Sequence, residues 1–148
     1  MQLVRTTSDS PDFQYLTKLF DTFLIDIDGD EKDFFAQYNQ IYIPNVVICY
    51  EDGIAVGCGA IKTYDEKTGE IKRMFVHPEH RNKGIAMSVL QELETWAKEL
   101  AFTSCILETS HKLVNAIALY QKFGYQPIPN YGQYIGVASS VCLKKELQ

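Results

Sequence analysis

An amphipathic helix over residues 84–100 limits the possible folds more than any other part of the chain. Its apolar side chains recur every three or four positions and form one stripe: Ile85, Val89, Leu90, Leu93, Trp96, Ala97 and Leu100. Runs rich in β-branched and apolar residues predict strands on either side of it, over residues 70–77 and 103–109. The chain is therefore expected to contain a β-α-β unit.

Strand and helix patterns alternate through the rest of the sequence. Ser10 followed by Pro11 predicts a helix start, because a capping side chain and then proline suit the first helical positions. Asp52-Gly53 predicts the tight turn of a hairpin. The other expected elements are strands over residues 2–6, 45–50, 54–62, 138–145 and, as one further strand, 125–128, and helices over residues 11–27, 31–39 and 115–123.

Hairpins followed by a β-α-β unit imply an α/β (α+β) fold. We expect a mixed, mainly antiparallel central sheet of six to seven strands, flanked by about four helices. No repeat, low-complexity tract or long linker divides the 148 residues, so a single domain over residues 1–148 is expected. With 46% hydrophobic and 22% charged residues, the composition is that of an ordinary globular protein.

Net charge and cysteine spacing exclude several classes of function. A formal net charge of −5 does not favour binding to nucleic acid or to an anionic membrane. No apolar run approaches the ~20 residues of a membrane span, and the first residues lack the apolar core of a signal peptide. The four cysteines contain no CxxC pair and are expected to be buried thiols. A cytoplasmic protein is expected.

No metal site is expected. Residues 26–31 are acidic, but an EF-hand needs glycine at its sixth position and glutamate at its twelfth, and Glu31 and Gln37 stand there. His77 and His80 are close in sequence but have no evident third ligand for zinc.

A basic loop joins the strand over residues 70–77 to the long helix. Residues 72–83 carry four basic side chains and one acid, although the whole chain is negative. Gly84 permits a backbone conformation in which successive N–H groups surround an anion, and the helix start adds unsatisfied donors. The patterns GxGxxG and GxxxxGK[ST] are absent, which disfavours nicotinamide and nucleoside-triphosphate sites. The loop is thus a candidate pyrophosphate site, with a solvated basic loop as the alternative.

Two segments resemble the GCN5-related N-acetyltransferases, the GNAT superfamily. Residues 70–86, EIKRMFVHPEHRNKGIA, resemble motif A, whose core Q/R-x-x-G-x-G/A is matched by Arg81, Gly84 and Ala86. Residues 116–125, AIALYQKFGY, are similar to motif B, A-x-x-x-Y-x-K-x-G-F/Y. The two follow each other in the family's order and spacing. The resemblance implies a GNAT-like fold and acetyl-CoA as the acetyl donor, with no metal.

The resemblance also implies a set of donor-binding residues. In the family, the strand before the loop diverges from the strand after the helix, and pantetheine lies in the gap. Many members also place asparagine three residues before the motif B alanine, but this chain has Leu113 there, and the nearby Asn115 is a candidate helix cap. By position, pantetheine would meet the backbone of Met74, Phe75 and Val76, and the pyrophosphate would meet Arg81, Asn82, Lys83, Gly84, Ile85 and Ala86.

Tyr120 and Glu70 are the candidate catalytic residues. Tyr120 matches the motif B tyrosine, which in many members protonates the departing thiolate, and a phenol within hydrogen-bond reach can do so. Packing in the core is the alternative. Glu70 stands where several members carry a general base for the incoming amine. The alternatives there are a strand-edge carboxylate paired with a lysine, Glu108 as the base, or a route through water.

The predicted function is an N-acetyltransferase that moves an acetyl group from acetyl-CoA to a primary amine of a small molecule or peptide. Direct attack is expected, because neither motif contains a cysteine for an acyl-enzyme. The alternatives are a CoA-binding sensor or interaction module without catalysis, and an enzyme for longer acyl chains. Residues 1–33 carry eight acids and three bases, which favours a cationic acceptor, and residues 131–136 are candidates for its pocket. Many relatives pair through edge strands, so a homodimer is a further expectation.

Overall fold

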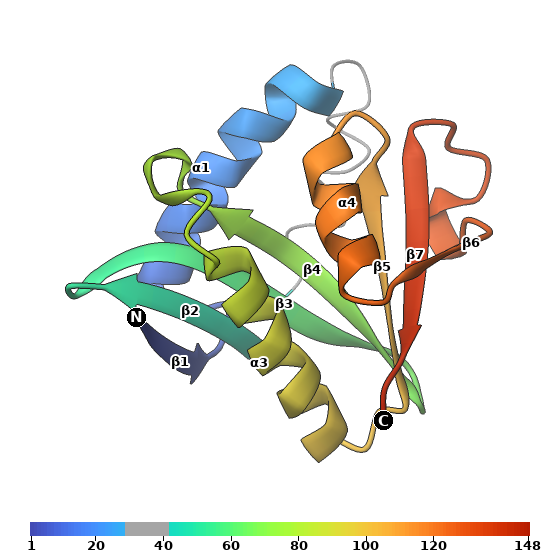
Figure 1. The fold of residues 1–148 in the computed structure, drawn as a ribbon, viewed down its shortest axis with the longest axis horizontal. Coiled ribbons are helices and arrows are strands. Elements are labelled where there is room, and N and C mark those ends of the chain that lie inside the picture. The colour runs from blue at the N-terminus through green and yellow to red at the C-terminus, as the bar shows by residue number, and fades with distance from the viewer. Residues whose placement is uncertain (29–41) are drawn as a thin grey trace.

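A seven-stranded mixed sheet forms the centre of the computed structural model, which describes residues 1–28 and 42–148 (Figure 1). The strand order is β1-β2-β3-β4-β5-β7-β6. Within the described ranges, β4 and β5 run parallel and the other neighbouring pairs are antiparallel. The strands are β1 (Gln2–Thr6), β2 (Asn45–Glu51), β3 (Ile54–Asp65), β4 (Thr68–Val76), β5 (Ser104–Ser110), β6 (Gln126–Ile128) and β7 (Ser140–Glu146).

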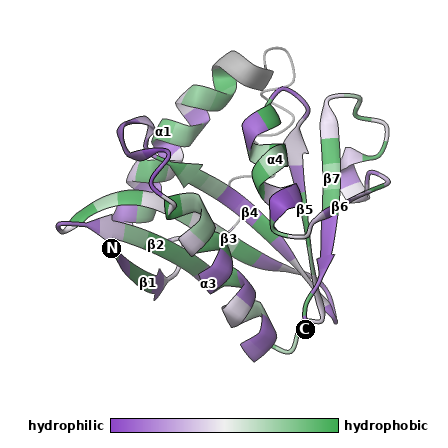
Figure 2. Ribbon diagram, viewed as in Figure 1, coloured by the Kyte–Doolittle hydropathy of each residue, from purple (hydrophilic) through white to green (hydrophobic). Residues whose placement is uncertain are grey.

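Helices cover both faces of this sheet. They are α1 (Pro11–Asp28), α3 (Ile85–Glu99) and α4 (Val114–Lys122), with short 3-10 turns at Pro78–His80 and Gly132–Tyr134. Alternate residues of β2 show the two faces, because Val46 and Ile48 pack in the cluster that contains α1, whereas Val47 and Cys49 pack in the cluster that contains α3. Tyr120 places α4 on the α3 side. Figure 2 shows the corresponding hydrophobic residues in β2 and β3.

Local sequence signals decide where the elements begin. The backbone N–H of Phe13 donates to Ser10 Oγ at 3.3 Å, so the predicted cap of α1 is confirmed. Asp52 and Gly53 both have positive φ, 51° and 79°, as a two-residue hairpin turn between β2 and β3 requires. In α3, five of the seven predicted stripe residues are buried, whereas Trp96 is half-buried and Leu100 is exposed at the helix end.

The predicted fold class is confirmed, including the seventh strand, which is β6 at the edge of the sheet. The helix expected over residues 31–39 lies outside the described residues. The hairpin between β3 and β4 is tighter than expected, since β3 continues to Asp65 and β4 starts at Thr68. In the described part of the chain, no helix is both long and apolar enough to cross a membrane.

Candidate active site

Strand β4 contains a bulge near the middle of the sheet. Cys58 of β3 lies opposite Phe75, but Ala60, two residues further on, lies opposite Lys72, three residues away. The extra β4 residue coincides with Arg73, whose φ of 57° is a left-handed conformation that is uncommon outside glycine. A bulge bends a strand and increases its twist. The direction of β4 therefore changes at this point.

Beyond the bulge, β4 separates from its parallel neighbour. Residues 68–71 of β4 pair with residues 104–107 of β5, and the ladder stops there. Strand β5 stays paired with β7 as far as Ser110, so β4 is the strand that leaves (Figure 1). The edge of β4 from Lys72 to Val76 thus faces a gap, with backbone groups that no neighbouring strand of the described residues uses.

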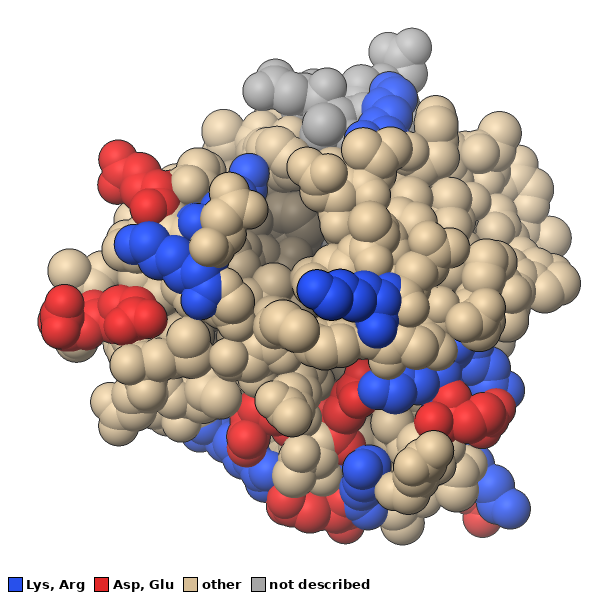
Figure 3. Space-filling model, in the orientation of Figure 1, with Lys and Arg blue, Asp and Glu red and all other residues tan. Residues whose placement is uncertain are grey.

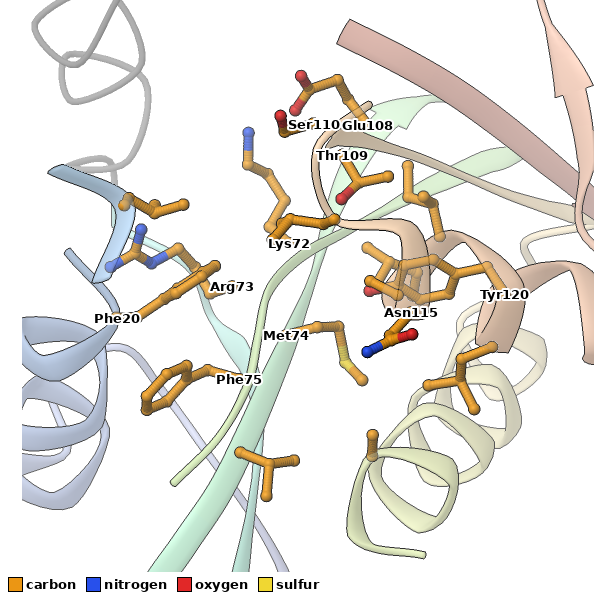
Figure 4. A pocket seen from close by; sticks show the side chains of 18 of the residues that line it. Phe20, Lys72, Arg73, Met74, Phe75, Glu108, Thr109, Ser110, Asn115 and Tyr120 are labelled. Carbon is orange, nitrogen blue, oxygen red and sulfur yellow. The ribbon is translucent and has the colours of Figure 1, made fainter. Parts of the chain in front are cut away.

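A cavity of about 630 Å³ occupies the place where the two strands diverge. Its walls are residues 70–76 of β4, residues 107–110 of β5, the start of α4, one side of α1 and the loop that precedes α3. Figure 3 shows a hollow in this face of the molecule with Lys and Arg side chains on its rim, and Figure 4 shows its lining from close by. The charged lining residues are Glu70, Lys72, Arg73, Arg81, Glu108 and Lys112.

Most of the predicted site residues meet in this cavity. Those that line it are Glu70, Met74, Phe75, Val76, Arg81, Asn82, Ala86 and Tyr120. The other three, Lys83, Gly84 and Ile85, do not line it. The Lys83 side chain is exposed, and Ile85 is only 1% exposed within the core, so Ile85 has only its backbone to offer a ligand. Gly84 has a φ of 80°, and a Cβ built there would meet no atom within 4 Å.

The loop before α3 offers positive charge and free backbone donors at one end of the cavity. The N-cap of α3 is Gly84, and no side-chain cap bond is found there among the described residues, so the first N–H groups of the helix remain available. Arg81 donates from Nε to the Val76 carbonyl oxygen at 3.1 Å, and its guanidinium lies 5.4 Å from the ring centroid of Phe23 and 5.8 Å from that of Phe75. These contacts hold the cation beside the loop, an arrangement that suits a phosphate group.

Tyr120 points its hydroxyl from α4 into the cavity (Figure 4). The residue is 7% exposed, and its ring packs edge-on against Tyr125 with centroids 5.9 Å apart. No described residue forms a hydrogen bond with its hydroxyl. Burial raises the pKa of Tyr120 above its ordinary value, so the phenol stays protonated at neutral pH. The group can therefore donate a proton to a ligand in the cavity.

The two candidate bases, Glu70 and Glu108, lie on neighbouring strands and both line the cavity. Glu70 is 5% exposed and accepts a hydrogen bond from the Tyr131 hydroxyl at 2.7 Å. Glu108 accepts one from Ser140 Oγ at 2.6 Å. Within the described ranges, no ion pair includes Glu70, so the alternative of a carboxylate paired with a neighbouring lysine is wrong for these residues.

Two cationic lining residues, Lys72 and Arg73, are not among the predicted site residues, although both belong to the basic segment 72–83. Arg73 connects the bulge to α1, because its Nη2 donates to Asp21 Oδ1 at 2.7 Å and to the Thr17 carbonyl oxygen at 3.0 Å. Its guanidinium also lies 4.9 Å from the Phe20 ring centroid. The available signal was the three charged residues among positions 70–73, Glu70, Lys72 and Arg73, inside a segment that was expected to be a strand.

The expected helix cap at Asn115 is also wrong. Leu113 is the N-cap of α4 and Asn115 is its second residue, because the helix begins at Val114. Both Leu113 and Asn115 line the cavity.

The described residues offer few groups for cysteine-based or metal-based catalysis. Cys49, Cys58, Cys105 and Cys142 are all buried free thiols. Burial raises the pKa of Cys58 and of Cys105 to about 12, which keeps both thiols protonated. Across residues 1–28 and 42–148, no three His, Cys, Asp or Glu side chains are placed to hold a metal ion together.

Known proteins resemble this chain in both sequence and fold. The profile of the Acetyltransferase (GNAT) family matches residues 7–125. A protein named IAA acetyltransferase from Azospirillum brasilense is 30% identical over 135 residues, which cover 89% of this chain and 88% of that protein. A crystal structure from Klebsiella pneumoniae, solved under the name acyl-CoA N-acyltransferase, matches with a TM-score of 0.84 at 28% identity, over 99% of this chain and 97% of that one.

A GNAT family acetyltransferase from Elizabethkingia anophelis, solved with acetyl-CoA bound, matches with a TM-score of 0.72 at 20% identity, over 99% of this chain and 97% of that one. This likeness concerns the fold. Together with the family profile over residues 7–125 and the relatives above, the matches show that the chain belongs to the GNAT family of acetyltransferases and is an acyl-CoA N-acetyltransferase of that family.

Proposed function

We propose that this protein transfers the acetyl group of acetyl-CoA to a primary amine of a small molecule or peptide. The observation that carries the proposal is the cavity between β4 and β5, which collects a cation, a phenol and a carboxylate in one space: Arg81, Tyr120 and Glu70. The Elizabethkingia relative, whose fold matches over 97% of its length, was solved with acetyl-CoA bound. That relative supports the choice of donor.

The donor would lie along the separated edge of β4. Its pantetheine amides would meet the unpaired backbone edge from Met74 to Val76, as a further strand would. Its pyrophosphate would meet Arg81 and the backbone N–H groups from Asn82 to Ala86. The open space in front of Gly84 is consistent with close approach of a bulky anion to this backbone.

The groups in the cavity support direct attack of the amine on the thioester of acetyl-CoA. The amine nitrogen bonds to the thioester carbonyl carbon, the C–S bond breaks, and CoA leaves as a thiolate. Glu70 takes the proton of the amine, directly or through water, and Tyr120 gives its proton to the sulfur. No cysteine lines the cavity within the described ranges, so no thiol there is placed to form an acyl-enzyme. Buried free cysteines also support a cytoplasmic location.

The experiment that tests the function is a thiol-release assay with acetyl-CoA and a panel of primary amines. Amine-dependent release of CoA, with the acetylated amine identified by mass spectrometry, supports the proposal. Calorimetry with CoA is run beside it, with Arg81→Ala as the variant expected to bind more weakly. Binding of CoA without release for any amine would instead favour the non-catalytic sensor.

The same assay separates the two candidate bases. Glu70→Gln should lower kcat by about 10²-fold or more if Glu70 is the base, since a positioned base contributes at least that much. Glu108→Gln keeps the shape of the other carboxylate and serves as the matched comparison. A larger fall in kcat for Glu108→Gln than for Glu70→Gln would assign the proton transfer to Glu108. Small changes in kcat for both variants would favour a route through water.

A further inference from the structure

Lys72 is a buried ammonium in the wall of the cavity. The residue is 9% exposed, and its Nζ donates to the Tyr134 hydroxyl at 3.2 Å. This is the one hydrogen bond of Nζ among the described residues. A lysine ammonium carries three N–H donors. Two of its donors therefore have no acceptor in the described part of the protein.

Among the described residues, the charge of Lys72 also lacks a carboxylate within ion-pair distance. No ion pair of the described residues includes Lys72, although Glu70 and Glu108 are near enough to act on its pKa. Its neighbour Arg73, by contrast, is paired with Asp21 at 2.7 Å. Burial lowers the pKa of Lys72, which means that the folded protein bears a cost for holding this charge. An anionic group on a ligand would remove that cost.

Lys72 points away from the part of the cavity proposed for the donor. Figure 4 shows its side chain reaching toward Glu108 and Ser110, away from Met74 and thus from the edge of β4 assigned to the donor. Glu70 is two residues earlier on β4, before the bulge, and residues two apart on a strand share a face about 7 Å apart. This spacing suits one small molecule that presents an amine to Glu70 and an anion to Lys72.

We propose that the amine acceptor carries a carboxylate, as an amino acid does, and that Lys72 binds this carboxylate while Glu70 faces the amine. The inference rests on the proposed function and names the acceptor class of that same site. Two tyrosines of residues 131–136 would hold both ends of this arrangement, since Tyr131 donates to Glu70, Tyr134 accepts from Lys72, and their rings are 5.5 Å apart.

The first test uses the wild-type protein and matched acceptors. Pools of the common amino acids, of their carboxamides and of the corresponding decarboxylated amines are each supplied with acetyl-CoA, and the best substrate of each pool is identified from its acetylated product. The kcat/KM of the best amino acid should exceed that of its own carboxamide by about 10- to 100-fold, the size expected for a charge-assisted hydrogen bond. Equal values would refute the inference and leave the acetyltransferase function standing, whereas no release with any amine would refute both.

The second test asks whether Lys72 provides the preference. Lys72→Met should lower kcat/KM for the amino acid by about 10- to 100-fold and for its carboxamide by less than about threefold, and Lys72→Arg should restore most of the difference. Lys62→Met is the matched control, because Lys62 lies opposite Glu70 on β3 and near Lys72 but does not line the cavity. It should keep the preference.

Equal losses for both acceptors in Lys72→Met, in a protein that still binds CoA and melts as the wild type does, would mean that Lys72 acts on the reaction itself. That result would overturn the assignment. Should Lys72→Met not fold, the comparison of acceptors with the wild-type protein still decides whether a carboxylate is recognised.

Discussion

The Tyr120→Phe variant should fold as the wild type does and lose most of its turnover. Phenylalanine keeps the ring that packs against Tyr125 and removes only the hydroxyl. Because no described residue is hydrogen-bonded to that hydroxyl, its removal leaves no described polar group unpaired. The free energy of unfolding is therefore expected to change by less than about 1 kcal/mol.

The loss of activity should be much larger than the loss of stability. A positioned general acid contributes about 10²- to 10⁴-fold to a rate, and a 10²-fold loss corresponds to about 2.7 kcal/mol of transition-state stabilisation. The raised pKa of Tyr120 keeps the wild-type phenol protonated at neutral and mildly alkaline pH. The ionisation of this group should thus cause no fall in kcat between about pH 7 and 9.

The assay measures kcat from CoA release at saturating amine, the acetyl-CoA Kd by calorimetry, and the midpoint of thermal unfolding. We expect kcat to fall by about 10²-fold or more, with Kd changed by less than about threefold and an unaltered midpoint. A parallel loss of turnover and affinity, or a lower midpoint, would show that Tyr120 only packs the cavity wall. Such a result would refute the argument for proton donation.

Three further outcomes are expected. Gly84→Ala should weaken acetyl-CoA binding by about tenfold, because a side chain at φ 80° strains the turn and projects into the open space before the loop. Gly53→Ala is the control, because Gly53 has a φ of 79° and equally open surroundings in a distant hairpin. The control should lower stability by a similar amount and leave the acetyl-CoA KM unchanged. Asp21→Ala should lower the free energy of unfolding by about 1–3 kcal/mol in a denaturant titration, because it leaves the buried Arg73 guanidinium without its carboxylate, and an unchanged curve would contradict this. The four buried thiols should react with a disulfide reagent at pH 8 only after unfolding, because a pKa of about 12 leaves Cys58 roughly 10⁻⁴ ionised, and rapid labelling of the native protein would refute it.

The residues of the proposed donor half could be picked out from the sequence because most of them are contiguous. The proposed pyrophosphate contacts, Arg81 to Ala86, are the end of one loop and the first residues of α3, and the apolar stripe of that helix is visible in the sequence. Short-range signals of the same kind located the start of α1 at Ser10 and the hairpin turn at Asp52-Gly53. In each case the determining atoms lie within a few residues of one another, so sequence spacing is a direct measure of geometry.

The bulge at Arg73 could not be read from the residues alone. A left-handed φ is usually signalled by glycine or asparagine, and arginine gives no such signal. What holds it is tertiary, namely the ion pair with Asp21 and the contact with Phe20 on α1. The divergence of β4 from β5 was expected only through the resemblance to a family, and its local cause became visible in the register of β3 against β4.

The proposed acceptor half of the site depends on contacts between residues far apart in the chain. Tyr131 donates to Glu70 and Tyr134 accepts from Lys72, although 61 and 62 positions separate these pairs. Because β5 lies between β4 and β7 in the sheet, the two tyrosines, from the loop before β7, must reach across the face of β5 to touch β4. The bulge in β4 follows directly after Lys72, so Glu70 and Lys72 lie before the bend and the proposed donor edge lies after it. The proposed acceptor contacts include Tyr131 and Tyr134, whereas the proposed pyrophosphate contacts come from residues 81–86, so a change in the length of the loop over residues 131–136 should alter the choice of amine and leave the donor loop intact.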